Sequence, residues 1–134
     1  MRLLRLTALA LVLALAAGCG SKSGGGNAGA AQTPVLDEVA GLLRAASETK
    51  TPTKVADLAK YEPTFPTGYR AVKSGDVVVV WGAKMAGEGS SGSGSGEVIA
   101  YEKKVPTEGG FVLLTSGTVK EMTADEFKAA PKAK

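Results

Sequence analysis

The spacing of apolar residues changes near residue 69, and this change constrains the fold more than any other feature of the sequence. Within residues 33–47 the apolar residues recur at intervals of three and four, as on one face of an α-helix: Val35, Leu36, Val39, Leu42, Leu43 and Ala46. From residue 69 onward, β-branched and aromatic residues form short runs that glycine and serine separate, which is typical of strands. Helical segments followed by successive strands predict an α+β domain.

Two helices are expected before the strands. The first is amphipathic and spans residues 33–47. Its apolar face is interpreted as the main core contribution of a small domain, and the alternative is a surface that docks a partner. The second helix is short and spans residues 54–61, with Thr53 as its expected N-cap and Pro63 after its end.

Five short segments carry the strand pattern: residues 69–73, 77–81, 97–103, 111–115 and 118–122. Residues 74–76 are the expected hairpin loop between the first two strands, and Ser116-Gly117 is the expected tight turn between the last two. Both faces of residues 77–81 (VVVVW) are apolar, which favours a central place in the sheet. The predicted architecture is one amphipathic helix plus a short helix packed on a four- to five-stranded antiparallel sheet.

A short C-terminal helix is expected after the last strand. Thr123 and Glu126 have the spacing of a capping box, and Met122 and Phe127 have the spacing of a hydrophobic staple across the same helix start. The single small domain is therefore expected over residues 33–130. The remaining tail, residues 131–134 (PKAK), is expected to fray.

The C-terminal segment GGFVLLTSGTVKEMTADEF, residues 109–127, resembles the end of uncharacterised bacterial pilin-like and pseudopilin-like domains. Those families end with an apolar strand, a turn, a second strand and a short helix capped by Thr or Ser. The resemblance covers roughly residues 35–130 and implies an α+β fold. Ser116 stands where the families commonly have aspartate. No catalytic residue is implied by the resemblance.

The N-terminus has the features of a bacterial lipoprotein signal. Arg2 and Arg5 precede an apolar run over residues 6–17, which is shorter than the roughly 20 residues that a spanning helix needs. Small residues then lead directly into Cys19, the only cysteine, and this border resembles a lipobox. The interpretation is a signal peptide over residues 1–18, a lipidated Cys19, and a lipid-anchored protein of the cell envelope that faces the periplasm or the exterior. The alternatives are an uncleaved membrane-edge segment and an ordinary signal peptide.

Two stretches are rich in glycine and serine. Residues 19–32 contain the lipidated Cys19 and an expected flexible tether, and residues 87–96 form an expected disordered loop within the domain. Gly87, Gly89 and Gly92 match the G-x-G-x-x-G pattern. Because no helix is expected after them, the pattern does not predict a dinucleotide site.

Charge and composition exclude several classes of function. Loss of residues 1–18 removes two of the 16 basic residues and none of the 13 acidic ones, so the formal charge falls from +3 to +1. This balance and the few aromatic residues do not predict nucleic-acid binding. The chain has no histidine, the usual general base and a frequent metal ligand. No catalytic residue, cofactor or metal is therefore predicted.

The remaining carboxylates near predicted loops and strand ends are interpreted as a solvated surface: Asp76, Glu88, Glu97, Glu102 and Glu108. Trp81 and Tyr101 are interpreted as core residues, with a ligand groove as the alternative. The sequence therefore predicts a membrane-anchored, non-enzymatic surface lipoprotein that acts as a protein-interaction or structural module. Its expected partners are membrane lipid, through acylated Cys19, and an envelope protein. The alternative is a small-ligand carrier or minor enzyme with a pocket between helix and sheet.

Overall fold

A four-stranded antiparallel sheet forms the centre of the molecule in the computed structural model, which describes residues 33–86 and 96–134. The strands follow one another in the sheet in the order of the sequence, and each pairs with the next. They are β1 (Val77–Val79), β2 (Val98–Glu102), β3 (Gly110–Leu114) and β4 (Val119–Met122). With the helices described below, this arrangement confirms the predicted α+β class and the short C-terminal helix.

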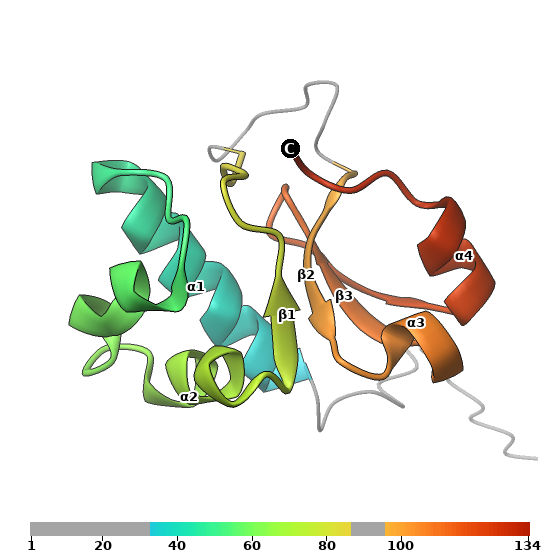
Figure 1. Cartoon of the computed structure of the whole chain (residues 1–134), viewed down its shortest axis with the longest axis horizontal. Helices are drawn as coiled ribbons and strands as arrows, with labels where there is room; N and C mark the ends of the chain where they lie inside the picture. Colours follow the sequence, from blue (N-terminus) through green and yellow to red (C-terminus); the bar gives the residue numbers. More distant parts are fainter. Residues whose placement is uncertain (1–32, 87–95) are drawn as a thin grey trace, which may run out of the picture.

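Helices cover both faces of this sheet (Figure 1). On one face lie α1 (Thr33–Thr49), the 3₁₀-helix η1 (Val55–Tyr61) and α2 (Pro66–Ser74). On the other face lie α3 (Val105–Glu108) and α4 (Ala124–Ala129). The apolar residues therefore form two separate clusters, one on each side of the sheet.

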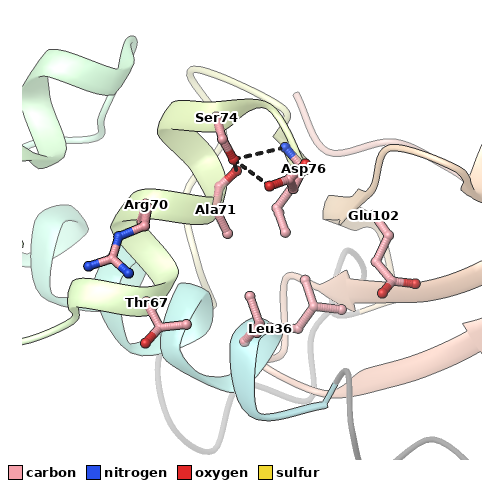
Figure 2. Close-up of a pocket in the computed structure, with 9 residues that line it drawn as sticks. Leu36, Thr67, Arg70, Ala71, Ser74, Asp76 and Glu102 are labelled. Carbon is pink, nitrogen blue, oxygen red and sulfur yellow. Dashed lines mark hydrogen bonds between the residues drawn. The ribbon is translucent and has the colours of Figure 1, made fainter.

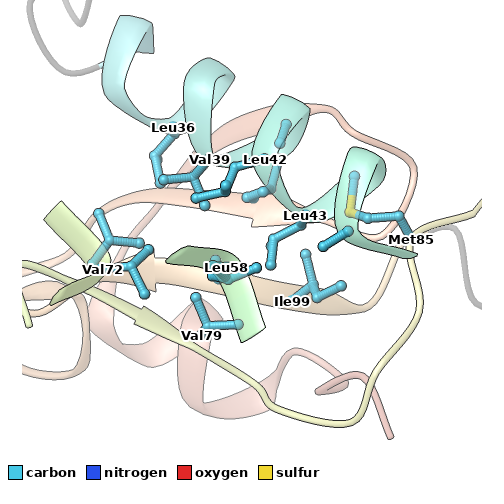
Figure 3. Close-up of a cluster of buried hydrophobic side chains, with 14 of the residues drawn as sticks. Leu36, Val39, Leu42, Leu43, Leu58, Val72, Val79, Met85 and Ile99 are labelled. Atoms are coloured by element: carbon cyan, nitrogen blue, oxygen red, sulfur yellow. The ribbon is translucent and has the colours of Figure 1, made fainter. Parts of the chain in front are cut away.

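The larger cluster confirms that the apolar face of α1 belongs to the core. Leu36, Leu42 and Leu43 are at most 1% exposed. Figure 3 shows the apolar side chains of α1 facing Val79 and Ile99 of the sheet. Burying large aliphatic side chains of this kind contributes roughly 1.5–3 kcal/mol each. The stripe on α1 is therefore not free to dock a partner.

The smaller cluster lies under α3 and α4 and contains Val98, Val105, Val112, Met122 and Phe127. Thr123 is the N-cap of α4, and the predicted capping box is present. The Thr123 backbone N–H donates to the Glu126 carboxylate at 2.8 Å, and the Glu126 N–H donates to Thr123 Oγ1 at 3.2 Å. Met122 and Phe127 are both buried in this cluster, as expected for residues that flank a helix start.

The strand predicted at residues 69–73 is wrong, because this segment is part of helix α2. Pro66 occupies the first turn, and Gly75 ends the helix with a φ of 83°. Tyr69 and Val72, three positions apart, are the residues that α2 buries in the main core. A proline at the start and a left-handed glycine just past the end are ordinary helix signals. Residues 74–76 are therefore the end of this helix and its connection to β1, and not a hairpin loop.

The central position predicted for residues 77–81 is also wrong. Only Val77–Val79 are in β1, and β1 is an edge strand of the sheet. Val77 and Val79 point to the face that the helices cover and are 4% and 6% exposed. Beyond the end of β1 the Val80 N–H still donates to the Ile99 carbonyl at 2.8 Å, and Val80 and Trp81 pack against the main core. The apolar side chains of this run are therefore explained by packing against the main core and not by a neighbouring strand on each edge of β1.

Two smaller predictions are corrected by hydrogen bonds. Thr53 does not cap η1 through its own oxygen; instead its N–H and hydroxyl donate to the Asp57 carboxylate at 2.9 and 3.0 Å.

The tail at residues 131–134 does not fray. Val98 donates to the Pro131 carbonyl at 2.9 Å, Ala133 donates back to the Val98 carbonyl at 3.0 Å, and Ala133 is buried.

Several predicted segments lie outside the described residues: the signal peptide at 1–18, Cys19 with the tether at 19–32, and all of the loop at 87–96 except Gly96. Ser116-Gly117 is the tight turn between β3 and β4, as predicted, and Gly117 has a φ of 88°. Along the described ranges, no helix has the length and apolarity required to cross a membrane.

Candidate functional site

A cavity of about 430 Å³ opens between the first turn of α1, helix α2 and the edge of the sheet (Figure 2). Its apolar wall consists of Val35 and Leu36 from α1, Ala71 from α2 and Val77 from β1. Its polar residues come from α2, from the connection to β1 and from the end of β2: Thr67, Arg70, Ser74, Asp76 and Glu102. A mostly apolar hollow with a few polar groups is typical of a small-molecule site.

The position of α2 against α1 forms one side of this cavity. The Gly68 N–H donates to a carboxylate oxygen of Glu38 at 2.6 Å. A Cβ on Gly68 would lie 3.0 Å from the backbone of Glu38 and Val39, so only glycine allows this approach without displacement. The glycine therefore lets α2 lie directly on α1, while the rest of α2 continues toward β1.

Glu102 is the buried acid of the cavity, with 7% of its surface exposed. Its Oε2 accepts a hydrogen bond from the Phe111 N–H at 2.8 Å, and the Lys104 ammonium lies 3.8 Å away. A Cβ on Gly110 would come within 2.6 Å of the same oxygen, so the glycine makes room for the carboxylate.

Asp76 lies at the exposed rim of the cavity. Its carboxylate accepts a hydrogen bond from the Ser74 hydroxyl at 2.6 Å, and its backbone carbonyl accepts one from the Lys103 N–H at 2.9 Å. No ion pair joins Asp76 or Arg70 to another described residue. Figure 2 shows the Arg70 guanidinium directed away from both Asp76 and Glu102. The cavity is thus lined by two carboxylates, of which Glu102 is paired with Lys104, and by the Arg70 guanidinium.

The carboxylates that the sequence interprets as a solvated surface do not all share one environment. Asp76 and Glu102 line the cavity together. Glu97 and Glu108 do not line it, and Glu88 lies outside the described residues. The interpretation of Glu102 as a solvated surface residue is wrong, because Glu102 is 7% exposed. It lies at the end of β2, which is flanked by β1 and β3, and neighbouring segments of the protein cover its side chain.

The two aromatic candidates do not line the cavity. Trp81 packs, partly buried, against the main core. Tyr101 lies on the other side of the sheet, where its ring is 4.6 Å from that of Phe127 at an interplanar angle of 54°. Both positions agree with the interpretation of these side chains as packing residues.

Sequence reasoning missed three residues of α2 that line the cavity: Thr67, Arg70 and Ala71. Their spacing of three and four places them on one side of a helix. The strand assignment at residues 69–73 put Arg70 and Ala71 on opposite faces. Pro66 and Gly75 were the available signals for the helix.

A second hollow of about 370 Å³ lies at the other end of α1 and includes Thr49, Lys60 and Tyr61. The hydroxyl groups of Thr49 and Tyr61 are 3.4 Å apart, and the Lys60 ammonium lies 4.7 Å from the centre of the Tyr61 ring. The hydrogen bond with Thr49, followed by the one with Lys60, lowers the pKa of Tyr61 below its usual 10.0. These contacts are between exposed groups and serve to join α1 to η1.

Ser74 is hydrogen-bonded at the end of α2, and the chain has no histidine to activate its hydroxyl. The described residues include no group of three or more His, Cys, Asp or Glu placed to hold a metal ion. No protein-family model, curated protein or solved structure matches this chain.

Proposed function

We propose that this chain is a lipid-anchored, non-enzymatic protein of the bacterial cell envelope whose folded domain carries a small ligand. The anchor is supported by the signal-like residues 1–18 and by the position of Cys19 directly after them. More than one acyl chain is needed for stable attachment to a membrane, and a lipidated N-terminal cysteine of this type supplies them.

The observation that carries ligand binding is the cavity of about 430 Å³ between α1, α2 and the sheet. Its volume lies within the usual range of small-molecule sites, roughly 300–1,000 Å³. A protein-interaction surface on α1 is less favourable, because the apolar face of that helix is buried in the main core. The cavity therefore favours the ligand-carrier function over the protein-interaction module.

The protein-interaction module stays a prediction, and so does the resemblance to pilin-like domains. β4, the other edge strand, carries exposed Lys120 and Glu121, and charged residues at an edge disfavour the pairing of a further strand. An envelope partner would therefore have to bind elsewhere on the domain.

The predicted anchor is close in sequence to two residues that line the cavity. Val35 and Leu36 line the cavity only a few residues after the predicted tether at 19–32. A Gly-rich segment of that length has a root-mean-square span of roughly 20 Å. We therefore expect the ligand site to be held close to the membrane surface.

The anchor is tested by metabolic labelling with a palmitate analogue. Cys19→Ser should lose the label and retain the signal peptide, because the lipid acceptor and the processing step depend on the same thiol. Unchanged labelling of Cys19→Ser would overturn the lipoprotein assignment.

Ligand carriage is tested separately, by mass spectrometry of small molecules that co-purify with the full-length protein. Ala71→Phe fills the cavity from α2 and should remove the co-purifying species. Ala129→Phe, at an exposed position of α4 on the other side of the sheet, is the matched control and should retain it. An identical profile for both variants would argue against a ligand in the cavity.

A further inference from the structure

The two acids that line the cavity are already paired within the protein. Glu102 accepts a hydrogen bond from the Phe111 N–H at 2.8 Å and forms an ion pair with the Lys104 ammonium at 3.8 Å. The Asp76 carboxylate is turned toward the Ser74 hydroxyl, which donates to it at 2.6 Å (Figure 2). A ligand of the cavity is therefore not selected by an unpaired acid, and its chemical class depends on the rest of the lining.

The lining separates a polar rim from an aliphatic wall. Apart from Glu102, its polar residues are exposed: Thr67, Arg70, Ser74 and Asp76. Its apolar residues are half-buried or buried: Val35, Leu36, Ala71 and Val77. Among the described residues that line the cavity none is aromatic, so a sugar or a base has no ring to stack on. The wall therefore fits an aliphatic chain whose polar end stays in water at the rim.

The cavity also lies close in sequence to the predicted membrane anchor. Val35 and Leu36 are in the first turn of α1, and residues 20–32 connect that helix to Cys19. A Gly-rich segment of this length has a root-mean-square span of roughly 20 Å. Lipid of the anchoring membrane is therefore within reach of the cavity, and its acyl chains supply hydrocarbon of the kind that the wall fits.

We infer that the cavity binds one acyl chain of a membrane lipid, with the chain along Leu36, Ala71 and Val77 and the head group at the exposed rim. The inference rests on the proposed anchor and ligand site, and it adds the chemical class of the ligand. A chain that enters the cavity exchanges one hydrocarbon environment for another, whereas the cavity wall is removed from water. The apolar area that the chain covers on the protein therefore drives binding.

The test uses the full-length protein in nanodiscs that contain a phospholipid with a photoactivatable diazirine near the end of one acyl chain. After irradiation, mass spectrometry of the digested protein should find lipid adducts on peptides that contain Leu36 or Ala71. Phosphatidylglycerol and phosphatidylcholine with the same labelled chain should give yields within about fivefold of each other, because exposed charges at a rim contribute little.

Two variants block the cavity in different ways. Ala71→Phe fills it from α2, and Thr67→Phe covers its mouth from an exposed position of the same helix, where the core is not disturbed. Each should lower the yield of these adducts about tenfold or more, since excluding even two methylene groups from the wall corresponds to a tenfold loss of affinity. Ala129→Phe, on α4 across the sheet, is the matched control and should keep the full yield.

Failure of this inference and failure of the proposed ligand site give different results. Adducts that survive in Ala71→Phe and Thr67→Phe would reflect closeness to the membrane alone and would overturn the inference, as would a head-group preference well above fivefold. A lack of cavity adducts, while Ala71→Phe still removes a co-purifying small molecule, would overturn the acyl chain and leave the ligand site intact. A lack of both would overturn the ligand site as well.

Discussion

Lys132 closes the C-terminal end of helix α4 over Phe127. The Lys132 ammonium donates hydrogen bonds to the backbone carbonyls of Phe127 and Ala130, and it lies 4.0 Å from the centre of the Phe127 ring. A positive charge at this end of a helix opposes the negative end of the helix dipole and pairs carbonyls that lack helical partners. The contact also directs the tail toward Val98, where the chain pairs with β2.

Lys132→Met should therefore destabilise the protein by about 1–3 kcal/mol, since it removes two hydrogen bonds from a charged donor and a cation–π contact. Urea unfolding measures the change, and hydrogen exchange at the Ala133 amide should become faster as the tail is released. Lys134→Met removes the same charge at an exposed position and is the control. Equal unfolding midpoints for the two variants would contradict the role given to Lys132.

Leu43→Ala should cost about 2–5 kcal/mol of unfolding free energy, because Leu43 is 1% exposed and its removal leaves a cavity between α1 and the sheet. Glu48→Ala, at an exposed position of the same helix, should change stability by less than about 0.5 kcal/mol. The comparison is made by urea unfolding monitored by circular dichroism. A cost for Leu43→Ala as small as that of the control would show that α1 is not packed as described.

Gly68→Ala should destabilise the contact between α1 and α2. The added Cβ would lie 3.0 Å from the backbone of Glu38 and Val39, and a backbone contact cannot be relieved by a rotamer change. Overpacking of this kind costs about 1–3 kcal/mol, which exceeds the gain of up to about 1 kcal/mol from replacing glycine by alanine in a helix. Thermal unfolding measures the difference. Gly96→Ala, where the new Cβ meets open space, should be nearly neutral.

The capping box of α4 predicts a pH-dependent stability. The hydrogen bond from the Thr123 backbone N–H, followed by that with the Thr123 side chain, holds the pKa of Glu126 below its ordinary value of 4.5. Because the folded pKa is the lower one, the carboxylate stabilises the folded state fully above pH 4.5, and this stabilisation is lost as the pH falls through the folded value.

Glu126→Gln should therefore be less stable than the unaltered protein at pH 7, and the difference should shrink as the pH is lowered below 4.5. Chemical unfolding over a pH series measures the gap. Glu121→Gln is the control for the change in net charge, since Glu121 is an exposed residue of β4. A gap for Glu126→Gln that stays constant through acid pH would contradict the capping contact. Thr123→Ala, which removes the other half of the box, should cost about 1 kcal/mol.

Local signals in the sequence were sufficient for several elements. The apolar spacing of residues 33–47 predicted α1, and the Thr123–Glu126 spacing predicted the cap of α4. All four strands lie within one residue of the predicted segments or inside them. Each of these features depends on residues a few positions apart, so the chain pattern contains the necessary information.

The candidate site was not predictable in the same way. Asp76 and Glu102 were each visible as carboxylates near strand ends, but their shared cavity depends on the pairing of Val77 with Glu102 across β1 and β2. The contribution of α2 to the cavity was hidden because YRAVK alternates like a strand, although Pro66 and Gly75 mark it as a helix.

The sequence by itself determined helix α1, the strand segments after residue 76 and the cap of α4, because each follows from neighbouring residues. Only the tertiary structure decided that β1 is an edge strand, that Glu102 is buried and that residues 131–134 are ordered. These three outcomes depend on contacts between residues far apart in the chain: β1 against the helices, Glu102 against Phe111, and the tail against Val98. Burial and pairing across such distances are set by how the layers pack, which local spacing does not encode.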